Sequence, residues 1–172
     1  MKALTELPKR QSGALSRKPK STRAGKQRPK ISSILVPIDF SAPSMKALGY
    51  ALDLAHEFHA HVTLLHVLEV LAAPEFATYP ILPDADRIGE VKTRLARLLR
   101  EKNGTANGMD AVKVRVGPPF KEIVRAAESL KADLIVIATH GYTGLAHVLL
   151  GSTAERVVRH ARCPVLVVPA RT

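Results

Sequence analysis

The residues with the clearest chemistry lie in a glycine-rich segment in the last third of the chain. Gly141 and Gly144 precede a second group that begins at Gly151 and continues through Ser152 and Thr153. Glycines let backbone N–H groups approach an anion closely. If a helix begins at Ser152, its first amides have no partner within the helix, and the helix dipole favours negative charge. These residue types indicate phosphate binding, although the segment is neither a dinucleotide fingerprint nor a P-loop.

The same residues also have a purely structural interpretation. Ser152 and Glu155 are three residues apart, which is the spacing of a capping box. Gly141 and Gly144 could serve only as turn residues. On local chemistry alone, phosphate binding and helix capping therefore remain open alternatives.

The glycine-rich segment follows the fourth of five short apolar runs, and amphipathic stretches separate these runs. Nearly continuous apolar runs are typical of strands in a parallel sheet. We expect strands at residues 34–38, 62–67, 112–116, 134–137 and 165–168, and helices whose apolar positions fall in residues 47–58, 88–99, 123–130 and 155–160. The alternation predicts an open parallel α/β sheet with helices on both faces, because each crossover is right-handed.

Such a sheet binds ligands beyond the carboxyl ends of its strands, at the topological switch point. The chain places Asp39, residues 67–69 and residues 138–152 at these ends. Asp39 could instead start the first helix, since Asp and Ser are favoured at helix N-caps. We interpret His66 as a packed residue and Cys163 as a small core residue rather than a nucleophile.

Four stretches of the chain resemble the universal stress protein family. They are residues 34–41, 64–67, 138–152 and 163–168, so the resemblance covers essentially residues 31–170. The nucleotide-binding branch of the family is marked by Gly-x-x-Gly, nine residues and Gly-Ser/Thr, which Gly141, Gly151 and Ser152 fit. Ala138 stands where the family has its first glycine. A position that needs a positive φ would strain alanine by about 1 kcal/mol, whereas a position that needs only little bulk would accept its methyl group.

The resemblance implies a Rossmann-like fold with strand order 3-2-1-4-5, a bound adenine nucleotide and a homodimer. The nucleotide is usually ATP, with ADP or AMP as alternatives, and Mg²⁺ can accompany it. Its adenosine would contact Pro37, Ile38, Asp39 and Val67, and its sugar would lie over Ile137 and Ala138. Its phosphates would be surrounded by His140, Gly141, Gly151, Ser152 and Thr153. The dimer would form through the last strand, which exposes an apolar edge made of Val165, Leu166, Val167 and Val168.

The positive charge of the chain is concentrated at its N-terminus. The net charge is +11, and residues 1–30 contain ten Lys or Arg and one acid. These residues include no aromatic side chain and cannot offset the cost of ordering their backbone. We expect a disordered basic tail at residues 1–30, followed by one α/β domain at residues 31–172. The tail could contact nucleic acid weakly, or it could be a solubilising extension; its prolines argue against a transit peptide.

Composition excludes several classes of protein. The chain contains no run of 18 apolar residues, so we expect no membrane span, and residues 1–30 lack the apolar core of a secretory signal. Cys163 is the only cysteine, which excludes a disulfide framework and indicates a reducing compartment, most simply the cytoplasm. The seven histidines show no spacing typical of metal ligands.

With the resemblance, these observations predict an ATP-binding regulatory protein of the stress response. Residues 138–153 contain no Asp, Glu, Lys or Arg, and phosphoryl transfer needs groups that hold a metal and orient water. Any hydrolysis should therefore be slow, and we predict no catalytic residue. The alternatives are a slow ATP hydrolase and a nucleotide-independent dimeric scaffold whose basic tail binds nucleic acid.

Overall fold

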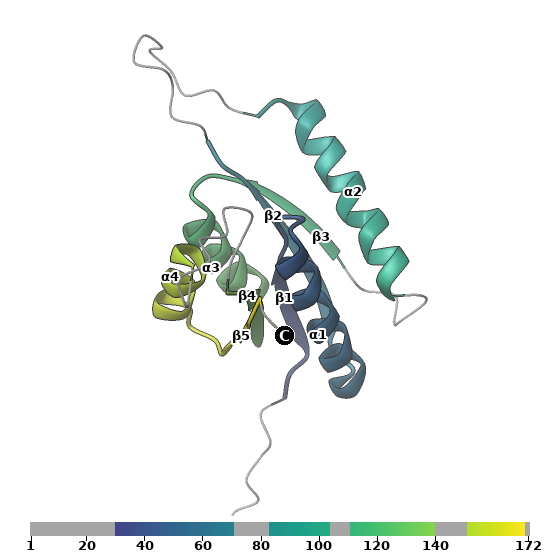
Figure 1. Cartoon of the computed structure of the whole chain (residues 1–172), viewed down its shortest axis with the longest axis vertical. Coiled ribbons are helices and arrows are strands. Elements are labelled where there is room, and N and C mark those ends of the chain that lie inside the picture. The colour runs from purple at the N-terminus through teal and green to yellow at the C-terminus, as the bar shows by residue number, and fades with distance from the viewer. Residues whose placement is uncertain (1–29, 71–82, 104–110, 140–150, 171–172) are drawn as a thin grey trace, which may run out of the picture.

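The structure is a computed structural model that describes residues 30–70, 83–103, 111–139 and 151–170. Within these ranges five strands alternate with four helices, as the sequence predicts (Figure 1). The strands are β1 (Ser33–Pro37), β2 (His61–Leu68), β3 (Ala111–Val116), β4 (Leu134–Ala138) and β5 (Val165–Val168), and the helices are α1 (Ala42–Phe58), α2 (Ala85–Asn103), α3 (Pro119–Leu130) and α4 (Ser152–His160). The expected basic tail lies outside the described residues except for Lys30.

The five strands form one parallel sheet in the order β3-β2-β1-β4-β5. Ile34 of the central strand lies opposite Val62 on one side and Leu134 on the other. From β1, the strands β2 and β3 are added on one side of the sheet, and β4 and β5 are added on the other. The topological switch point therefore lies between β1 and β4. The predicted fold class and strand order are confirmed.

Side chains of β1 alternate between two hydrophobic cores, one on each face of the sheet. Ile34 and Val36 pack in the first core with α1 and α2, whereas Leu35 packs in the second core with α3 and α4. All three side chains are fully buried, and burial of each contributes roughly 1.5–3 kcal/mol. Figure 1 shows the resulting three layers, with α1 and α2 on one side of the sheet and α3 and α4 on the other.

The ends of the elements differ from the predicted ends by a few residues. β1 stops at Pro37, one residue earlier than expected, because Pro37 has no N–H for the ladder; Ile38 N still donates to Leu65 O at 2.8 Å. α1 and α3 both end at a residue in the left-handed conformation, His59 and Lys131, respectively. In the part of the chain that is described, none of the helices has the length and apolar character needed to cross a membrane.

Candidate functional site

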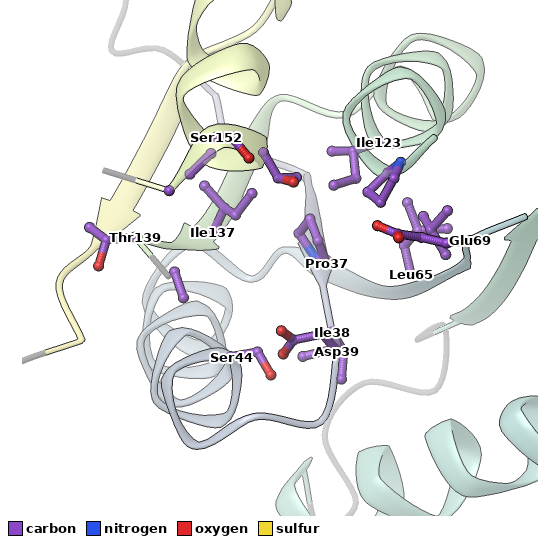
Figure 2. Close-up of a pocket in the computed structure, with 16 residues that line it drawn as sticks. Pro37, Ile38, Asp39, Ser44, Leu65, Glu69, Ile123, Ile137, Thr139 and Ser152 are labelled. Atoms are coloured by element: carbon purple, nitrogen blue, oxygen red, sulfur yellow. The ribbon is translucent and has the colours of Figure 1, made fainter. Parts of the chain in front are cut away.

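A pocket of about 360 Å³ lies at the carboxyl ends of β1, β2 and β4. α3 and the first turn of α4 complete its walls, so the pocket occupies the switch point of the sheet, where the sequence predicts a ligand site (Figure 2). Its lining is formed by Pro37, Ile38, Asp39, Ser44, Leu65, Val67, Glu69, Pro119, Ile123, Ile137, Ala138, Thr139, Gly151, Ser152, Thr153 and Ala154.

The structure brings together nine of the eleven residues that the sequence analysis assigns to a nucleotide. These nine line the pocket: Pro37, Ile38, Asp39, Val67, Ile137, Ala138, Gly151, Ser152 and Thr153. The other two, His140 and Gly141, lie outside the described residues. Residues from three strand ends and one helix start, far apart in the sequence, therefore meet at one cavity.

Asp39 is held by the start of α1. Its Oδ1 accepts hydrogen bonds from the backbone N of Ser41 at 3.0 Å and from Ser41 Oγ at 2.6 Å. Ser41 is the N-cap of α1, and its Oγ accepts from the backbone N of Ser44 at 3.3 Å. The capping interpretation of Asp39 therefore needs revision, because Asp39 supports the cap residue and does not occupy the cap. The same carboxylate lines the pocket, so helix capping and ligand binding are compatible here.

The turn that carries Ile38 and Asp39 is also stabilised by residues of β2 and α2. His66 Nδ1 lies 2.7 Å from Ile38 O, and because a carbonyl only accepts, Nδ1 must carry the hydrogen. The imidazole packs against Phe40 in a tilted arrangement, at 5.1 Å between ring centroids, and the Arg94 guanidinium of α2 lies 3.8 Å from the Phe40 ring centroid. His66 is packed, as predicted, but it also fixes the end of β1.

Phe40 itself occupies the left-handed region, with φ of 64°. A residue with a Cβ in this region costs roughly 1–2 kcal/mol. The two ring contacts of Phe40 and the hydrogen bonds of Asp39 and His66 offset that cost. The conformation turns the chain sharply from the end of β1 into α1, and this turn presents Asp39 to the pocket.

The start of α4 corrects the predicted capping box. The N-cap is Gly151, so Ser152 is the first helical residue and makes no side-chain cap. Glu155 pairs instead with Arg159, at 2.6 Å from Oε1 to Nη2. The prediction placed the cap one residue too late, because a glycine N-cap leaves no side-chain signal in the sequence.

The first amides of α4 face the pocket without a side-chain cap. Gly151 N donates to Thr139 O at 2.6 Å. Among the described residues, the amides of Ser152, Thr153 and Ala154 have no acceptor. These three donors and the positive end of the helix dipole make this wall of the pocket favourable for an anion.

Ala138 lies at the end of β4 and does not have a positive φ. Of the two possibilities that the sequence left open, the strained conformation is therefore excluded. Ala138 is 9% exposed and lines the pocket. Its side chain is a single methyl group, which agrees with a requirement for little bulk at the pocket wall.

The sequence analysis did not assign several lining residues to the site. Glu69, Pro119 and Ile123 are the most informative of them. Glu69 follows β2 and belongs to residues 67–69, which the sequence analysis placed at the end of a strand. Pro119 and Ile123 come from α3 and carry no ligand-binding pattern. Only the crossover that packs α3 beside the strand ends brings them to the pocket.

Charge in the described lining is confined to two carboxylates, Asp39 and Glu69, since no Lys or Arg belongs to it. The remaining lining is mainly aliphatic, including Ile38, Val67 and Ile137. Within the described ranges, no three His, Cys, Asp or Glu residues gather closely enough to hold a metal ion. The pocket therefore combines an apolar middle, a wall of amide donors and two acceptor carboxylates.

These features define the class of the protein, a doubly wound α/β protein with a ligand pocket at the switch point of its sheet. The sequence model of the universal stress protein family matches residues 30–169. The chain belongs to the universal stress protein family.

Two curated relatives cover most of the domain. The chain is 37% identical over 139 residues to Universal stress protein MJ0531 of Methanocaldococcus jannaschii, covering 78% of this chain and 80% of that protein. It is 32% identical over 145 residues to Universal stress protein YxiE of Bacillus subtilis, covering 80% of this chain and 98% of that protein.

Solved structures share the same architecture. Universal stress protein UspA from Lactobacillus plantarum matches with a TM-score of 0.67 and 25% identity, over 82% of this chain and 99% of that one. A universal stress protein in complex with cAMP matches with a TM-score of 0.61 and 23% identity, over 81% and 97% of the two chains. A universal stress protein from Archaeoglobus fulgidus in complex with dAMP matches with a TM-score of 0.53 and 20% identity, over 81% and 98%. The last two likenesses concern the fold alone.

Proposed function

We propose that this protein is a regulatory protein that binds an adenine nucleotide, ATP foremost, in the switch-point pocket. The observation that carries the proposal is the polarity of the pocket, whose amide donors at α4 stand at one end and whose apolar walls lie beside β1 and β2. A nucleotide has the matching order of groups, with an anionic phosphate at one end and a flat, largely apolar base at the other. Proteins of the same fold that hold cAMP and dAMP support this ligand class.

The roles of the lining residues follow from this orientation. The phosphates would accept hydrogen bonds from the first amides of α4, together with His140 and Gly141. The sugar would lie over Ile137 and Ala138. The base would lie against the residues at the ends of β1 and β2, which are Pro37, Ile38, Asp39 and Val67. Mg²⁺ would be coordinated mainly by the phosphates. The described residues include no group of three His, Cys, Asp or Glu side chains that could hold a metal ion.

The first test is to identify the resident ligand. Freshly purified full-length protein is denatured, and the released small molecules are identified by mass spectrometry. Calorimetric titration of nucleotide-free protein with ATP, ADP and AMP, with and without Mg²⁺, then ranks the ligands. We expect a released adenine nucleotide and a measurable heat of binding. Absence of both would refute the proposal and favour the nucleotide-independent scaffold.

The second test places the nucleotide in this pocket. Gly151 has φ of −64° and ψ of 149°, which any L-residue can adopt, so Gly151→Val should fold. Its side chain would occupy the approach to the α4 amides, and we expect loss of ATP binding. Gly89→Val is the matched control, because Gly89 lies on the exposed side of α2 with open space around it. Unchanged ATP affinity in Gly151→Val would refute this placement.

We further propose a homodimer formed through β5. β5 is an edge strand of apolar residues, and Leu166 at its centre is 37% exposed. Such an edge favours pairing with a second copy. Light scattering should show a dimer for the native protein and a monomer for Leu166→Lys. Tyr50→Lys, which changes a 51% exposed residue on α1, is the control; a Leu166→Lys dimer would refute this interface.

The basic tail is proposed to bind nucleic acid weakly and non-specifically. Its charge would release counterions from a polyanion, so binding should weaken steeply with salt. Removal of residues 1–30 should abolish salt-sensitive binding to RNA or DNA in a filter-binding assay and leave ATP affinity unchanged. Persistent binding by the shortened chain would assign the contact to the folded domain instead. We place the protein in the cytoplasm, because a single cysteine suits a reducing compartment.

Slow ATP hydrolysis is the alternative activity of the same pocket. The described lining offers carboxylates but no Lys or Arg to stabilise the charge of a transferring phosphoryl group. We therefore expect turnover far below the range of about 1–100 s⁻¹ typical of kinases. A phosphate-release assay with the Gly151→Val variant as blank measures it directly, and turnover within that range would overturn the regulatory assignment.

A further inference from the structure

Glu69 is a charged residue of the pocket with no structural role in the described part of the chain. It follows the last residue of β2, and its carboxylate points into the pocket toward Pro37 (Figure 2). It makes no hydrogen bond or ion pair with another described residue. Asp39, the other acid of the pocket, differs because its Oδ1 is engaged by Ser41.

Glu69 lies at the opposite end of the pocket from the α4 amides. The sheet order places β1 between β2 and β4, so β2 is two strand spacings, about 10 Å, from β4, and β2 continues to Leu68, three residues beyond the partner of Pro37. Thr139, next to the end of β4, is hydrogen-bonded to Gly151 at the start of α4. The pocket therefore has hydrogen-bond donors at one end and an acceptor carboxylate at the other.

From this polarity we propose that Glu69 determines base specificity by accepting a hydrogen bond from the exocyclic amino group of the base. An ionised carboxylate only accepts hydrogen bonds, so it can pair with the 6-amino group of adenine. A 6-oxo purine would instead place a carbonyl oxygen beside the carboxylate, and two acceptors repel each other. The proposal rests on the proposed nucleotide site and adds the residue that selects 6-amino over 6-oxo purines there.

The expected discrimination between ATP and ITP follows from the charge of Glu69 and its exposure to water. A hydrogen bond to a charged group contributes more than a neutral one, and a site built to pair with a donor rejects analogues that lack the donor. Because Glu69 is exposed, water weakens this discrimination. We expect ATP to bind roughly tenfold more tightly than ITP, well below the discrimination of a fully buried site.

The experiment measures affinities of the full-length protein for ATP, ITP and 2′-deoxy-ATP by calorimetry. Glu69→Gln is the informative variant, because its amide can accept from a 6-amino group or donate to a 6-oxo group. We expect its ATP-to-ITP affinity ratio to fall from about ten to near one. Glu90→Gln is the matched control, since it removes the same charge from the exposed surface of α2, and its ratio should equal that of the native protein.

The possible outcomes separate the two proposals. If the native protein binds ATP and Glu69→Gln keeps the native ATP-to-ITP ratio, the role of Glu69 is overturned and the nucleotide site stands. If Glu69→Gln changes the ATP-to-2′-deoxy-ATP ratio instead, Glu69 contacts the ribose and the base-reading role is overturned. If the native protein binds none of the three nucleotides, the proposed function falls, and the role of Glu69 falls with it.

Discussion

Replacement of His66 by phenylalanine should loosen the β1 end of the pocket while keeping the ring contact with Phe40. The substitution removes the hydrogen bond from Nδ1 to Ile38 O, which is 2.7 Å long. Ile38 is 2% exposed, and within the described residues its carbonyl has no other donor. Loss of the bond therefore leaves a buried acceptor unpaired, which costs about 1–3 kcal/mol.

The chain contains a matched control for this substitution. His160 Nδ1 lies 2.8 Å from Arg156 O, its ring packs against Phe120 in a tilted arrangement at 5.8 Å between centroids, and the Arg156 guanidinium lies over the Phe120 ring. His160 is exposed on α4 and does not line the pocket. Water can replace its hydrogen bond, so His160→Phe should cost less than about 1 kcal/mol.

Thermal unfolding and ATP titration together test the reasoning. At roughly 2–4 °C per kcal/mol for a chain of this size, His66→Phe should lower Tm by about 2–12 °C and His160→Phe by less than about 4 °C. Only His66→Phe should weaken ATP binding, because Ile38 and Asp39 line the pocket. Equal Tm changes, or native ATP affinity in His66→Phe, would show that this hydrogen bond does not fix the turn.

Three further predictions concern single residues outside the phosphate end of the pocket. Phe40→Gly should be more stable in denaturant unfolding than Phe40→Ala by about 1 kcal/mol, because φ of 64° strains alanine but not glycine; the reverse order would contradict the left-handed turn. Gly117→Ala should lower the free energy of unfolding by about 1–3 kcal/mol, since φ is +145° and the new Cβ would lie 3.2 Å from Glu122 Cγ; an unchanged midpoint would contradict it. Burial raises the pKa of the Cys163 thiol, so its thiolate fraction at pH 8 is low, and alkylation should be slower in the folded protein than in guanidinium; equal rates would contradict burial.

The sheet could be predicted from the sequence because its inner strands β1, β2 and β4 are short, mainly apolar runs buried on two faces. The alternation of Ile34, Leu35 and Val36 between the two cores requires every residue of the run to be apolar. The edge strand β3 shows the complementary pattern, in which Lys113 interrupts the valines and is exposed. Parallel pairing then follows from the helices between the strands.

Features that depend on one residue's backbone conformation could not be predicted. The N-cap of α4 fell on Gly151 and not on Ser152, because glycine caps a helix without a side-chain signal. The left-handed conformation of Phe40 had no signal either, since it depends on Arg94 and His66, which come from distant elements. Local pattern cannot report a conformation that tertiary contacts stabilise.

The location of the pocket and its phosphate end were predictable, but the role of the carboxylate of Glu69 was not. Strand ends at a switch point form a crevice in any sheet of this topology, so Asp39, Val67 and Ala138 could be placed there from their positions at the strand ends. Whether Glu69 would be paired with a neighbouring cation or left to face the cavity depends on the side chains of α3 and the loops around it. Because α3 supplies Pro119 and Ile123, and no Lys or Arg is among the described lining residues, the acid is available to a ligand. Under the proposed function, the specificity of this site depends on the absence of a cation from α3, and its affinity for phosphate depends on the amides at the start of α4.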